Sequence, residues 1–256
     1  MRRVIGISVA IAVSSFMVTA DAQERKSIFA DPQNLQVLPK DISSGELSKT
    51  MRGFALGLGV RCQYCHVGEA GMPLSKFDFP ADEKETKATA RLMLQMMADI
   101  NAKTSTVAAK MDRPATEVTC VTCHRGQSRP RLIEAILGEE IEAGGGEAAV
   151  KKYKALRKEF YGSHSYDFTE RTVSRYADGL SGGNPDASLA LHHMNQEFYP
   201  ESAMVYVYLG DGYRAKGDFD KATGHLRKAL EINPKLSFVE RWLRAIDEEK
   251  KKAKPE

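Results

Sequence analysis

The sequence predicts an all-α protein of two parts, and two observations carry this prediction. First, each of two Cys-x-x-Cys-His pentapeptides follows a segment whose apolar residues recur at helical spacing. Second, the C-terminal half has a helical-hairpin pattern in which Pro200 and Pro234 lie 34 residues apart. The expected architecture is therefore a helix–turn–Cys-x-x-Cys-His domain followed by a module of α-helical hairpins.

The first 22 residues differ in composition from the rest of the chain. Two arginines precede an almost uncharged apolar run, residues 4–20, and Ala20-Asp21-Ala22 supplies the small residues of a cleavage site. We expect residues 1–22 to be a signal peptide and the mature chain to begin at Gln23. The alternative is an uncleaved membrane anchor, but a run of about 17 residues is marginal for spanning a bilayer. No cysteine follows the run to carry a lipid, so the sequence predicts a periplasmic protein without a transmembrane segment in its mature chain.

The overall composition is that of a globular protein with one large domain or two small ones. The 256 residues are 42% hydrophobic, and 37 lysines and arginines against 34 aspartates and glutamates give a net charge of +3. This composition excludes collagen-like and wholly disordered chains. The charge is mild and no basic patch is interleaved with aromatic residues, so we expect no nucleic-acid partner.

The four cysteines form two Cys-x-x-Cys pairs, and a histidine directly follows each pair: Cys62, Cys65 and His66; Cys120, Cys123 and His124. Two thiols at this spacing can each form a thioether bond with one vinyl group of a haem, and the adjacent imidazole then reaches the iron. The alternatives are a zinc site and a redox-active dithiol, but neither requires a histidine immediately after each pair. The sequence therefore predicts two covalent c-type haems, with the cysteines as attachment points and the histidines as proximal iron ligands.

The segment before the first pentapeptide predicts a distal ligand for the first iron. Ser43 and Glu46 form a capping box that begins a helix, and Gly59 can end it in a left-handed turn. Met51 lies on the apolar face of this helix, 11 residues before Cys62, and the turn directs that face toward the haem. A methionine on such a face is usually core packing. Because a haem must bury one side against the same face, we expect Met51 to be an iron ligand.

A helix expected from about Asp82 to Asn101 precedes the second pentapeptide, and residues 102–119 are expected to loop back to it. Met93 and Met97 share one face of this helix and Met96 flanks that face, so geometry alone leaves all three open as distal ligands of the second iron. Histidine–methionine ligation raises the reduction potential relative to two histidines. The remaining candidate histidines lie outside both segments and are expected to be surface or packing residues: His164, His192, His193 and His225.

The second half of the chain is expected to be helical and to contain a repeat. Residues 136–168 are interpreted as linker and helix, with a small-residue stretch through Gly144-Gly145-Gly146 as linker or turn and a helix from Glu147 to Phe160. Residues 169–256 are interpreted as repeats with a terminal capping helix. The last repeat matches eight positions of the tetratricopeptide pattern: Tyr206, Leu209, Gly210, Tyr213, Ala222, Leu226, Ala229 and Pro234. Such a module either docks a partner in a groove or shields the domain before it.

The strings SGELSKTMRGFALGLGVRCQYCH, ARLMLQMMADIN and VTCVTCHRG resemble the haem-binding repeat of the photosynthetic reaction-centre cytochrome c subunit family. The resemblance covers roughly residues 34–130. It implies Met51 with His66 for the first haem, and for the second it favours Met93 with His124. That subunit carries four haem motifs and this chain has two, so residues 23–135 are interpreted as a dihaem cytochrome c domain.

These observations favour an electron carrier that relays single electrons between exported redox partners, which could include a membrane electron-transfer complex. We expect no enzymatic activity. One alternative is a dihaem peroxidase-type enzyme, which needs an iron with an open or displaceable position. The other is a haem-containing scaffold or sensor whose repeats bind a partner. Because residues 24–135 contain few large aliphatic residues beyond those near the expected haems, we also expect this part to require haem for folding.

Overall fold

The computed structural model describes residues 27–252, so the expected signal peptide lies outside the described residues. The described part is helical, and apart from one isolated bridge between Val67 and Asp78 it forms no strand. This confirms the all-α prediction. Its helices are α1 (Ser44–Leu58), α2 (Glu85–Lys110), α3 (Cys120–His124), α4 (Ile133–Phe160), α5 (Glu170–Leu180), α6 (Pro185–Phe198), α7 (Ala203–Ala215), α8 (Phe219–Ile232) and α9 (Ser237–Lys252), with short 3₁₀ turns η1 (Cys62–Tyr64) and η2 (Leu74–Lys76). Within residues 27–252, no helix is both long and apolar enough to span a bilayer.

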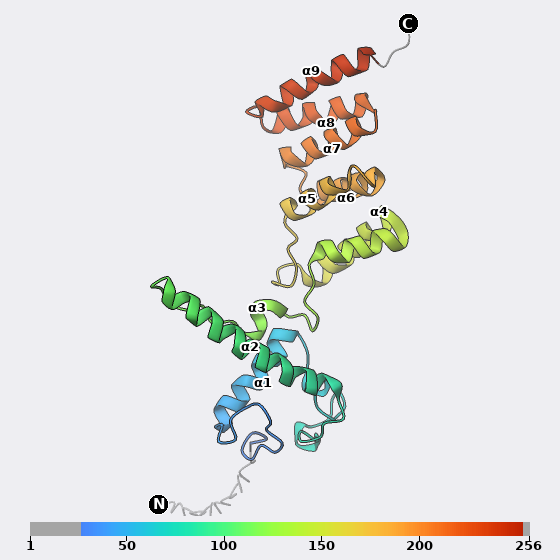
Figure 1. The fold of residues 1–256 in the computed structure, drawn as a ribbon. Helices are drawn as coiled ribbons and strands as arrows, with labels where there is room; N and C mark the ends of the chain where they lie inside the picture. The colour runs from blue at the N-terminus through green and yellow to red at the C-terminus, as the bar shows by residue number, and fades with distance from the viewer. Residues whose placement is uncertain (1–26, 253–256) are drawn as a thin grey trace, which may run out of the picture.

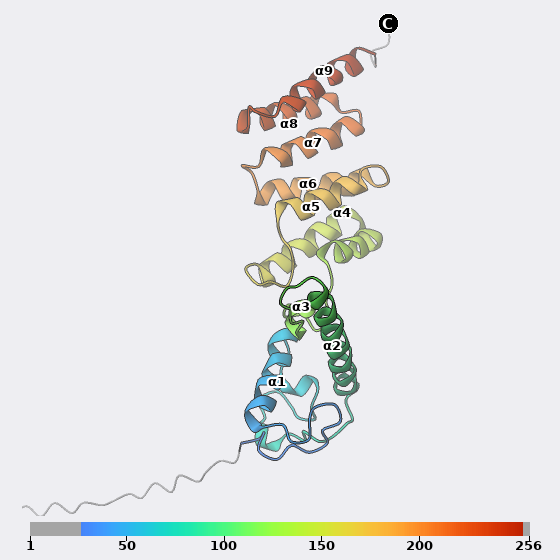
Figure 2. The same cartoon turned by 60° about the vertical axis from the view of Figure 1, so that its left-hand side comes forward.

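The molecule is elongated, and its two parts have different architectures. Helices α4 to α9 lie in successive layers that lead away from the N-terminal part (Figures 1 and 2). The N-terminal part contains α1, α2 and α3 with long connecting loops between them, and one end of α2 extends beyond its neighbours (Figure 1). The layered helices therefore form a stack, and the loops and Cys-x-x-Cys-His segments lie at its base.

Helix α1 begins and ends where the sequence predicts. The Ser43 hydroxyl accepts a hydrogen bond from the Glu46 amide at 3.2 Å, and the Glu46 carboxylate accepts one from the Ser43 amide at 3.2 Å. This reciprocal capping box satisfies two amides that would otherwise lack a partner at the helix start. Gly59 ends the helix at φ 66°, in the left-handed region that favours glycine. The turn delivers the chain to the first pentapeptide at Cys62.

Helix α2 extends beyond the predicted end at Asn101, so the expected loop over residues 102–119 is wrong for its first half. Residues 102–110 contain no glycine or proline, and the alanines and lysines among them favour helix. The chain leaves the helix only at Met111, shortly before Pro114. The side chain of Asn101 then holds the returning loop, because its amide donates to the Val118 carbonyl at 2.8 Å and its oxygen accepts from the Val118 amide at 2.7 Å.

The stretch before the glycine triplet is helical, which corrects its interpretation as linker. Ile133, Ile136 and Leu137 are buried in one cluster with Tyr153. Their spacing forms an apolar helical face that the neighbouring small residues obscure in the sequence. The turn lies within the triplet, at Gly144 and Gly145, whose backbone angles are not helical. Across it, the Lys152 ammonium lies 3.7 Å from the Glu140 carboxylate, so α4 is a pair of helical segments that fold back on each other.

Small residues allow the later helices to approach closely at the positions of the repeat pattern. A Cβ atom at Gly210 of α7 would lie 2.7 Å from Cγ of Leu226 of α8. Ala222 and Ala229 of α8 are completely buried beside this contact. The α7–α8 pair therefore packs as an antiparallel hairpin with its large and small residues in the places that the repeat requires. Helix α9 packs on α8 through Val239 and Ile246 and covers the end of the stack.

A polar face of α6 is buried within the stack. Ser188, His192 and Asn195 are each at most 2% exposed, and each has a side-chain atom without a hydrogen-bond partner. The imidazole of His192 stacks on Tyr208 of α7 with ring centroids 5.3 Å apart. Burial lowers the pKa of His192 to about 4, so the side chain is neutral at pH 7.

We expect the helical stack to lose stability between pH 6.5 and pH 4. In the unfolded chain the pKa of His192 is about 6.5, whereas in the folded chain it is about 4. Between these two values the unfolded chain binds a proton and the folded chain does not, so a falling pH favours unfolding. The neutral imidazole makes its full contribution to the free energy of unfolding above about pH 6.5, and this contribution decreases by about 2 kcal/mol by pH 5. Thermal unfolding followed by circular dichroism at pH 7 and pH 5 measures this loss.

His192→Phe is the control for this titration, because phenylalanine retains a ring against Tyr208 but takes up no proton. The difference in unfolding free energy between pH 7 and pH 5 should shrink in the variant. An equal pH dependence in the variant and the natural chain would contradict the assignment to His192.

Candidate functional site

The first Cys-x-x-Cys-His segment opens onto a cavity of about 300 Å³. Cys62, Cys65 and His66 line this cavity on one side, and Met51 of α1 lines it as well. The structure therefore brings together all four residues that the sequence predicts for the first haem. The rest of the wall is largely apolar and includes Leu47, Phe54, Val60, Leu74, Phe79 and Leu94.

The imidazole of His66 is held through one nitrogen, which leaves the other available. Its Nδ1 lies 3.3 Å from the carbonyl oxygen of Phe79, and the Phe79 ring packs edge-on at 5.0 Å. A carbonyl only accepts hydrogen bonds, so Nδ1 carries the proton and Nε2 keeps a free electron pair for a metal ion. Burial lowers the pKa of His66, which favours the neutral form that a ligand needs.

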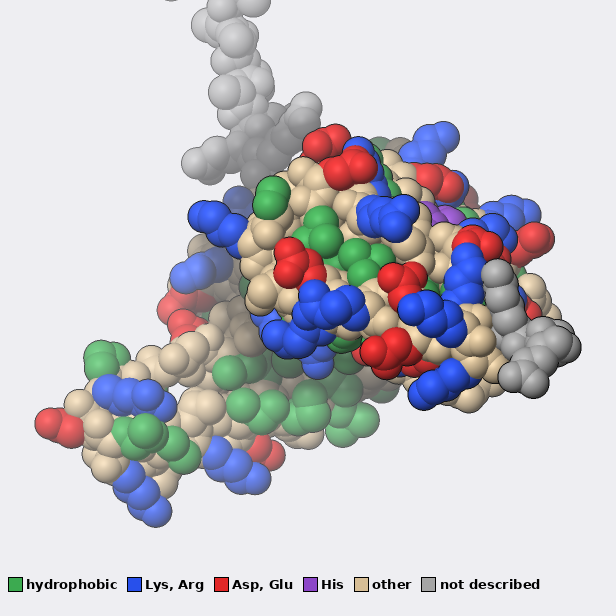
Figure 3. Space-filling model, turned by 90° about the horizontal axis from the view of Figure 1, so that it is seen from above, with side chains coloured by type: hydrophobic (Ala, Val, Ile, Leu, Met, Phe, Trp, Pro, Cys, Tyr) green, Lys and Arg blue, Asp and Glu red, His purple; other side chains and the backbone are tan. Residues whose placement is uncertain are grey.

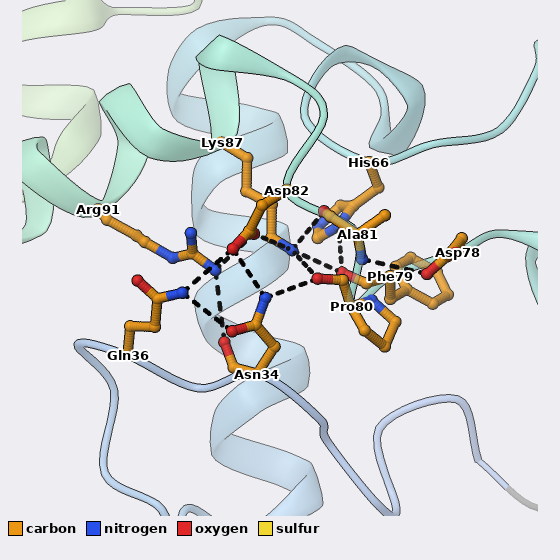
Figure 4. Close-up of polar contacts among 10 residues, drawn as sticks. All are labelled: Asn34, Gln36, His66, Asp78, Phe79, Pro80, Ala81, Asp82, Lys87 and Arg91. Carbon is orange, nitrogen blue, oxygen red and sulfur yellow. Dashed lines mark hydrogen bonds and ion pairs between the residues drawn. The ribbon is translucent and has the colours of Figure 1, made fainter.

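A cluster of charged and amide side chains borders the same cavity. The Asp82 carboxylate accepts hydrogen bonds from Arg91, Lys87, Asn34 and Gln36, at distances of 2.8, 2.9, 3.0 and 3.1 Å (Figure 4). The hydrogen bond from Arg91 is the largest of the effects that hold the pKa of Asp82 well below its usual range. The cluster ties the loop before α2 both to α2 itself and to the segment near Asn34. The sequence gives no sign of this cluster, because its members lie up to 57 positions apart and no local pattern links them.

The second Cys-x-x-Cys-His segment forms helix α3, and its histidine is held in the same way. Nδ1 of His124 lies 2.8 Å from the carbonyl oxygen of Gln127, so Nε2 again keeps its electron pair. Cys123 and His124 line a cavity of about 380 Å³, and the start of α4 and residues 165–167 form its other side. This cavity therefore lies between the second pentapeptide and the base of the helical stack.

The helical stack contacts the second pentapeptide directly. The Ser165 hydroxyl donates to the Arg125 carbonyl at 2.9 Å, and the Tyr166 hydroxyl donates to the Gln127 side chain at 3.3 Å. Gln127 is the residue whose backbone carbonyl holds His124. Sequence reasoning could not find this contact, because residues 165–166 lie in a connection with no motif of their own.

Unlike Met51, the three candidate methionines of α2 are not assigned to a cavity beside their expected histidine. Met93 is 40% exposed and Met96 is 48% exposed, whereas Met97 is half-buried on the same side of α2 as Leu94. None of the three lines the cavity beside His124. The structure therefore does not choose among them. The histidines outside the two segments are not part of either cavity, and His192 and His193 pack within the stack.

The second Cys-x-x-Cys-His segment packs against the end of α1, and glycines line this contact. The Gly126 amide donates to the Gly57 carbonyl at 2.8 Å, which joins the turn after α3 to the end of α1. A Cβ atom at Gly57 would lie 2.9 Å from Cβ of Cys120. Helix α1 therefore carries Met51 on the first cavity and contacts Cys120 of the second segment.

The N-terminal part fits a large apolar group, because it has almost no core of its own. Of the 25 buried hydrophobic residues in the described part of the chain, only Leu47 and Ala108 precede Ile133. Large apolar side chains in this part are instead exposed: Leu56 (77%), Leu92 (64%), Val121 (54%), Met96 (48%) and Met93 (40%). Figure 3 shows hydrophobic side chains at the surface where the N-terminal part projects below the stack. Two porphyrins attached at the cysteines would cover such surface.

The donor atoms of both segments suit haem c. All four cysteines are free thiols, and both histidines present an unprotonated Nε2. In residues 27–252, no three histidine, cysteine, aspartate or glutamate side chains gather as ligands of a single ion.

Comparisons with known proteins agree with these features. Residues 8–176 match the family described as photosynthetic reaction centre cytochrome C subunit, and residues 203–236 match the tetratricopeptide repeat. The photosynthetic reaction center cytochrome c subunit of Thermochromatium tepidum is 34% identical over 101 residues, which are 39% of this chain and 22% of that protein. Cytochrome c-554 of Chloroflexus aurantiacus is 35% identical over 92 residues, 36% of this chain and 20% of that protein. The chain thus matches about a fifth of the length of each of these relatives.

Proposed function

Because this chain belongs to the photosynthetic reaction centre cytochrome c subunit family, we propose that it is an exported dihaem carrier that relays single electrons between redox proteins. Membership of the family makes it a c-type cytochrome and makes haem c its cofactor. The number of haems, their ligands, the export of the chain and its partners are parts of the proposal. We propose a carrier and not an enzyme.

The first haem is proposed to be attached at Cys62 and Cys65, with His66 and Met51 as iron ligands. The observation that carries the proposal is that these four residues line one mostly apolar cavity, although Met51 comes from a different helix. An apolar wall and a thioether ligand both favour the ferrous over the ferric state, since they stabilise the lower charge. This site would therefore work at a higher potential than a solvent-exposed haem with two histidine ligands.

The second haem is proposed to be attached at Cys120 and Cys123, with His124 as proximal ligand. Three methionines of α2 remain candidates for the distal ligand. We propose Met93, with Met97 and Met96 as alternatives. The hydrogen bond from His124 to the Gln127 carbonyl supports the proximal ligand, and the exposed thioether of Met93 is free to reach a group that the apolar surface of this part would cover.

When bound, the haems supply the one-electron couple of their irons, and the protein positions and shields them. The cysteines fix each ring, the carbonyls of Phe79 and Gln127 orient the two imidazoles, and the apolar walls exclude water. The contact between Gly57 and Gly126 joins the end of α1, the helix that carries Met51, to the turn after the second attachment segment. We propose that this packing brings the two haems close enough for electron transfer from one to the other within the chain.

Export and docking complete the proposal. Residues 1–22 are proposed to be removed as a signal peptide, which would place the mature chain in the periplasm, where haem c is attached. The helical stack is proposed to dock redox partners, which could include a membrane electron-transfer complex, because tetratricopeptide-type hairpins present extended concave surfaces.

The haem content of the purified mature chain tests the proposal directly. We expect its intact mass to exceed that of residues 23–256 by two haem groups, and the pyridine haemochrome spectrum to give two haems per chain with the shape typical of two thioether bonds. Cys120→Ala with Cys123→Ala should leave one haem, attached at the first segment. A mature chain from a host with haem-attachment machinery that carries no added haem mass would refute the proposal.

A further inference from the structure

Lys87 of α2 holds the loop over residues 79–82 through its backbone carbonyls. Its side chain is only 12% exposed, and its ammonium lies 2.8, 2.9 and 2.7 Å from the carbonyl oxygens of Phe79, Pro80 and Ala81 (Figure 4). It also lies 2.9 Å from the Asp82 carboxylate. Residues 79–82 belong to no helix or strand. One cation therefore contacts three successive carbonyl groups, and the Pro80 oxygen also accepts from the Asn34 amide at 2.6 Å.

One of these carbonyl oxygens also holds the imidazole of His66. The Phe79 oxygen accepts from Nδ1 of His66 at 3.3 Å and from the Lys87 ammonium at 2.8 Å. A charged donor binds a carbonyl more strongly than a neutral one, and it withdraws electron density from the shared oxygen. Lys87 thereby limits how much electron density the Phe79 carbonyl returns to the imidazole through Nδ1–H.

The charges around the loop act in the same direction. Lys87 and Arg91 both line the cavity, and Asp82 is the anion with which both form ion pairs. Two cations and one anion leave one positive charge beside a mostly apolar cavity. A fixed positive charge in such surroundings disfavours a further positive charge on a group held there.

We propose that Lys87 is a positioning residue for the axial ligand His66, and that it raises the reduction potential of the first haem through the shared Phe79 carbonyl. This inference rests on the proposed function, since it requires a haem ligated by His66. It predicts that the loss of Lys87 lowers the potential for two reasons. The imidazole becomes more electron-rich, and one positive charge beside the cavity is removed.

The experiment compares Lys87→Met with Lys103→Met in the full-length haem-loaded protein. Lys103 is an exposed residue of the same helix that forms no ion pair in the described structure, so its substitution removes the same charge without touching the loop. Redox titrations give the two midpoint potentials, and ferric electron paramagnetic resonance reports the ligand field of each iron. The first haem is identified as the one whose resonance changes in Met51→His.

In Lys87→Met we expect the potential of the first haem to fall and its ferric resonance to shift, while the second haem keeps both values. Lys103→Met should leave both midpoint potentials and both ferric resonances unchanged. Lys87→Arg should recover part of the potential, because it restores a cationic donor. Asp82→Asn, which leaves the carbonyl contacts of Lys87 in place, should raise the same potential and keeps the inference testable if Lys87→Met fails to load haem.

Other results overturn the inference. A fall in potential without any change in the resonance would show a purely electrostatic role and no positioning. Unchanged values in Lys87→Met, or equal shifts at both haems, would show that Lys87 does not act on His66. A natural chain that carries no haem on the first segment would instead refute the proposed function, and the haem count separates that failure from the others.

Discussion

Expressed without haem-attachment machinery, the chain should have an N-terminal part that proteases digest up to about residue 130, and a helical stack that survives. The reason is the distribution of buried surface. Ordering about 100 residues costs on the order of 100 kcal/mol in conformational entropy, and apolar burial is the main term that offsets this cost. Only Leu47 and Ala108 among the buried hydrophobic residues lie before Ile133, so this part has too little burial of its own.

Limited proteolysis followed by mass spectrometry measures this directly. The matched control is the same chain with haem attached, in which the N-terminal part should become resistant. Thermal unfolding should show one transition for the haem-free chain, from the stack alone. A haem-free chain whose N-terminal part resists digestion and melts cooperatively would contradict the expectation and would show that the described side chains suffice as a core.

Local signals in the sequence predicted the parts of the site that neighbouring residues determine. The capping box at Ser43 and the glycine at position 59 fix α1 through hydrogen bonds and backbone angles within a few residues. The spacing of Met51 from Cys62 is likewise local, because one helix and one turn connect them. The structure places the pair on one cavity, as this short connection requires.

The parts that sequence reasoning missed depend on contacts between distant segments. Nothing near Lys87 in the chain indicates that its ammonium will meet three carbonyls of the preceding loop, or that Asn34 will join the same cluster. The helix at Ile133 was missed for another reason. Its apolar face is regular, but Gly138 and the following glycines lower the local helix propensity, and packing against Tyr153 overrides that preference.

The choice among the methionines of α2 shows the limit of helical periodicity. Met93 and Met97 lie one turn apart on nearly the same face, so a pattern of apolar residues treats them as equivalent. A ligand is chosen by the position of the iron relative to the helix axis, which depends on the loop between Lys110 and Cys120. That loop is held by the Asn101 side chain, a contact with no local signal in the sequence.

Gly57→Val should cost the haem-loaded protein about 3 kcal/mol of unfolding free energy. A Cβ atom at position 57 would lie 2.9 Å from Cβ of Cys120 and 3.2 Å from the Val121 amide nitrogen. These neighbours belong to a short helix whose backbone carries the attachment site, so they cannot rotate away as the end of a flexible side chain would. Overpacking of this kind typically costs about 1–3 kcal/mol, and the two further methyl groups of valine place it at the upper end.

Gly53→Val is the matched control, because position 53 lies on the same helix and a Cβ atom there would have no neighbouring side chain or loop within 4 Å. Its effect on the unfolding free energy should stay within about 0.5 kcal/mol, as for most exposed substitutions. Intact mass adds a second measurement. In Gly57→Val the fraction of chains with haem at Cys120 and Cys123 should fall, because α1 and the second attachment segment are forced apart. In Gly53→Val this fraction should not fall. Equal stability and equal haem content in the two variants would mean that α1 and the second attachment segment do not need this close approach. The contact at Gly57 would then no longer support our proposal that the two haems lie close together.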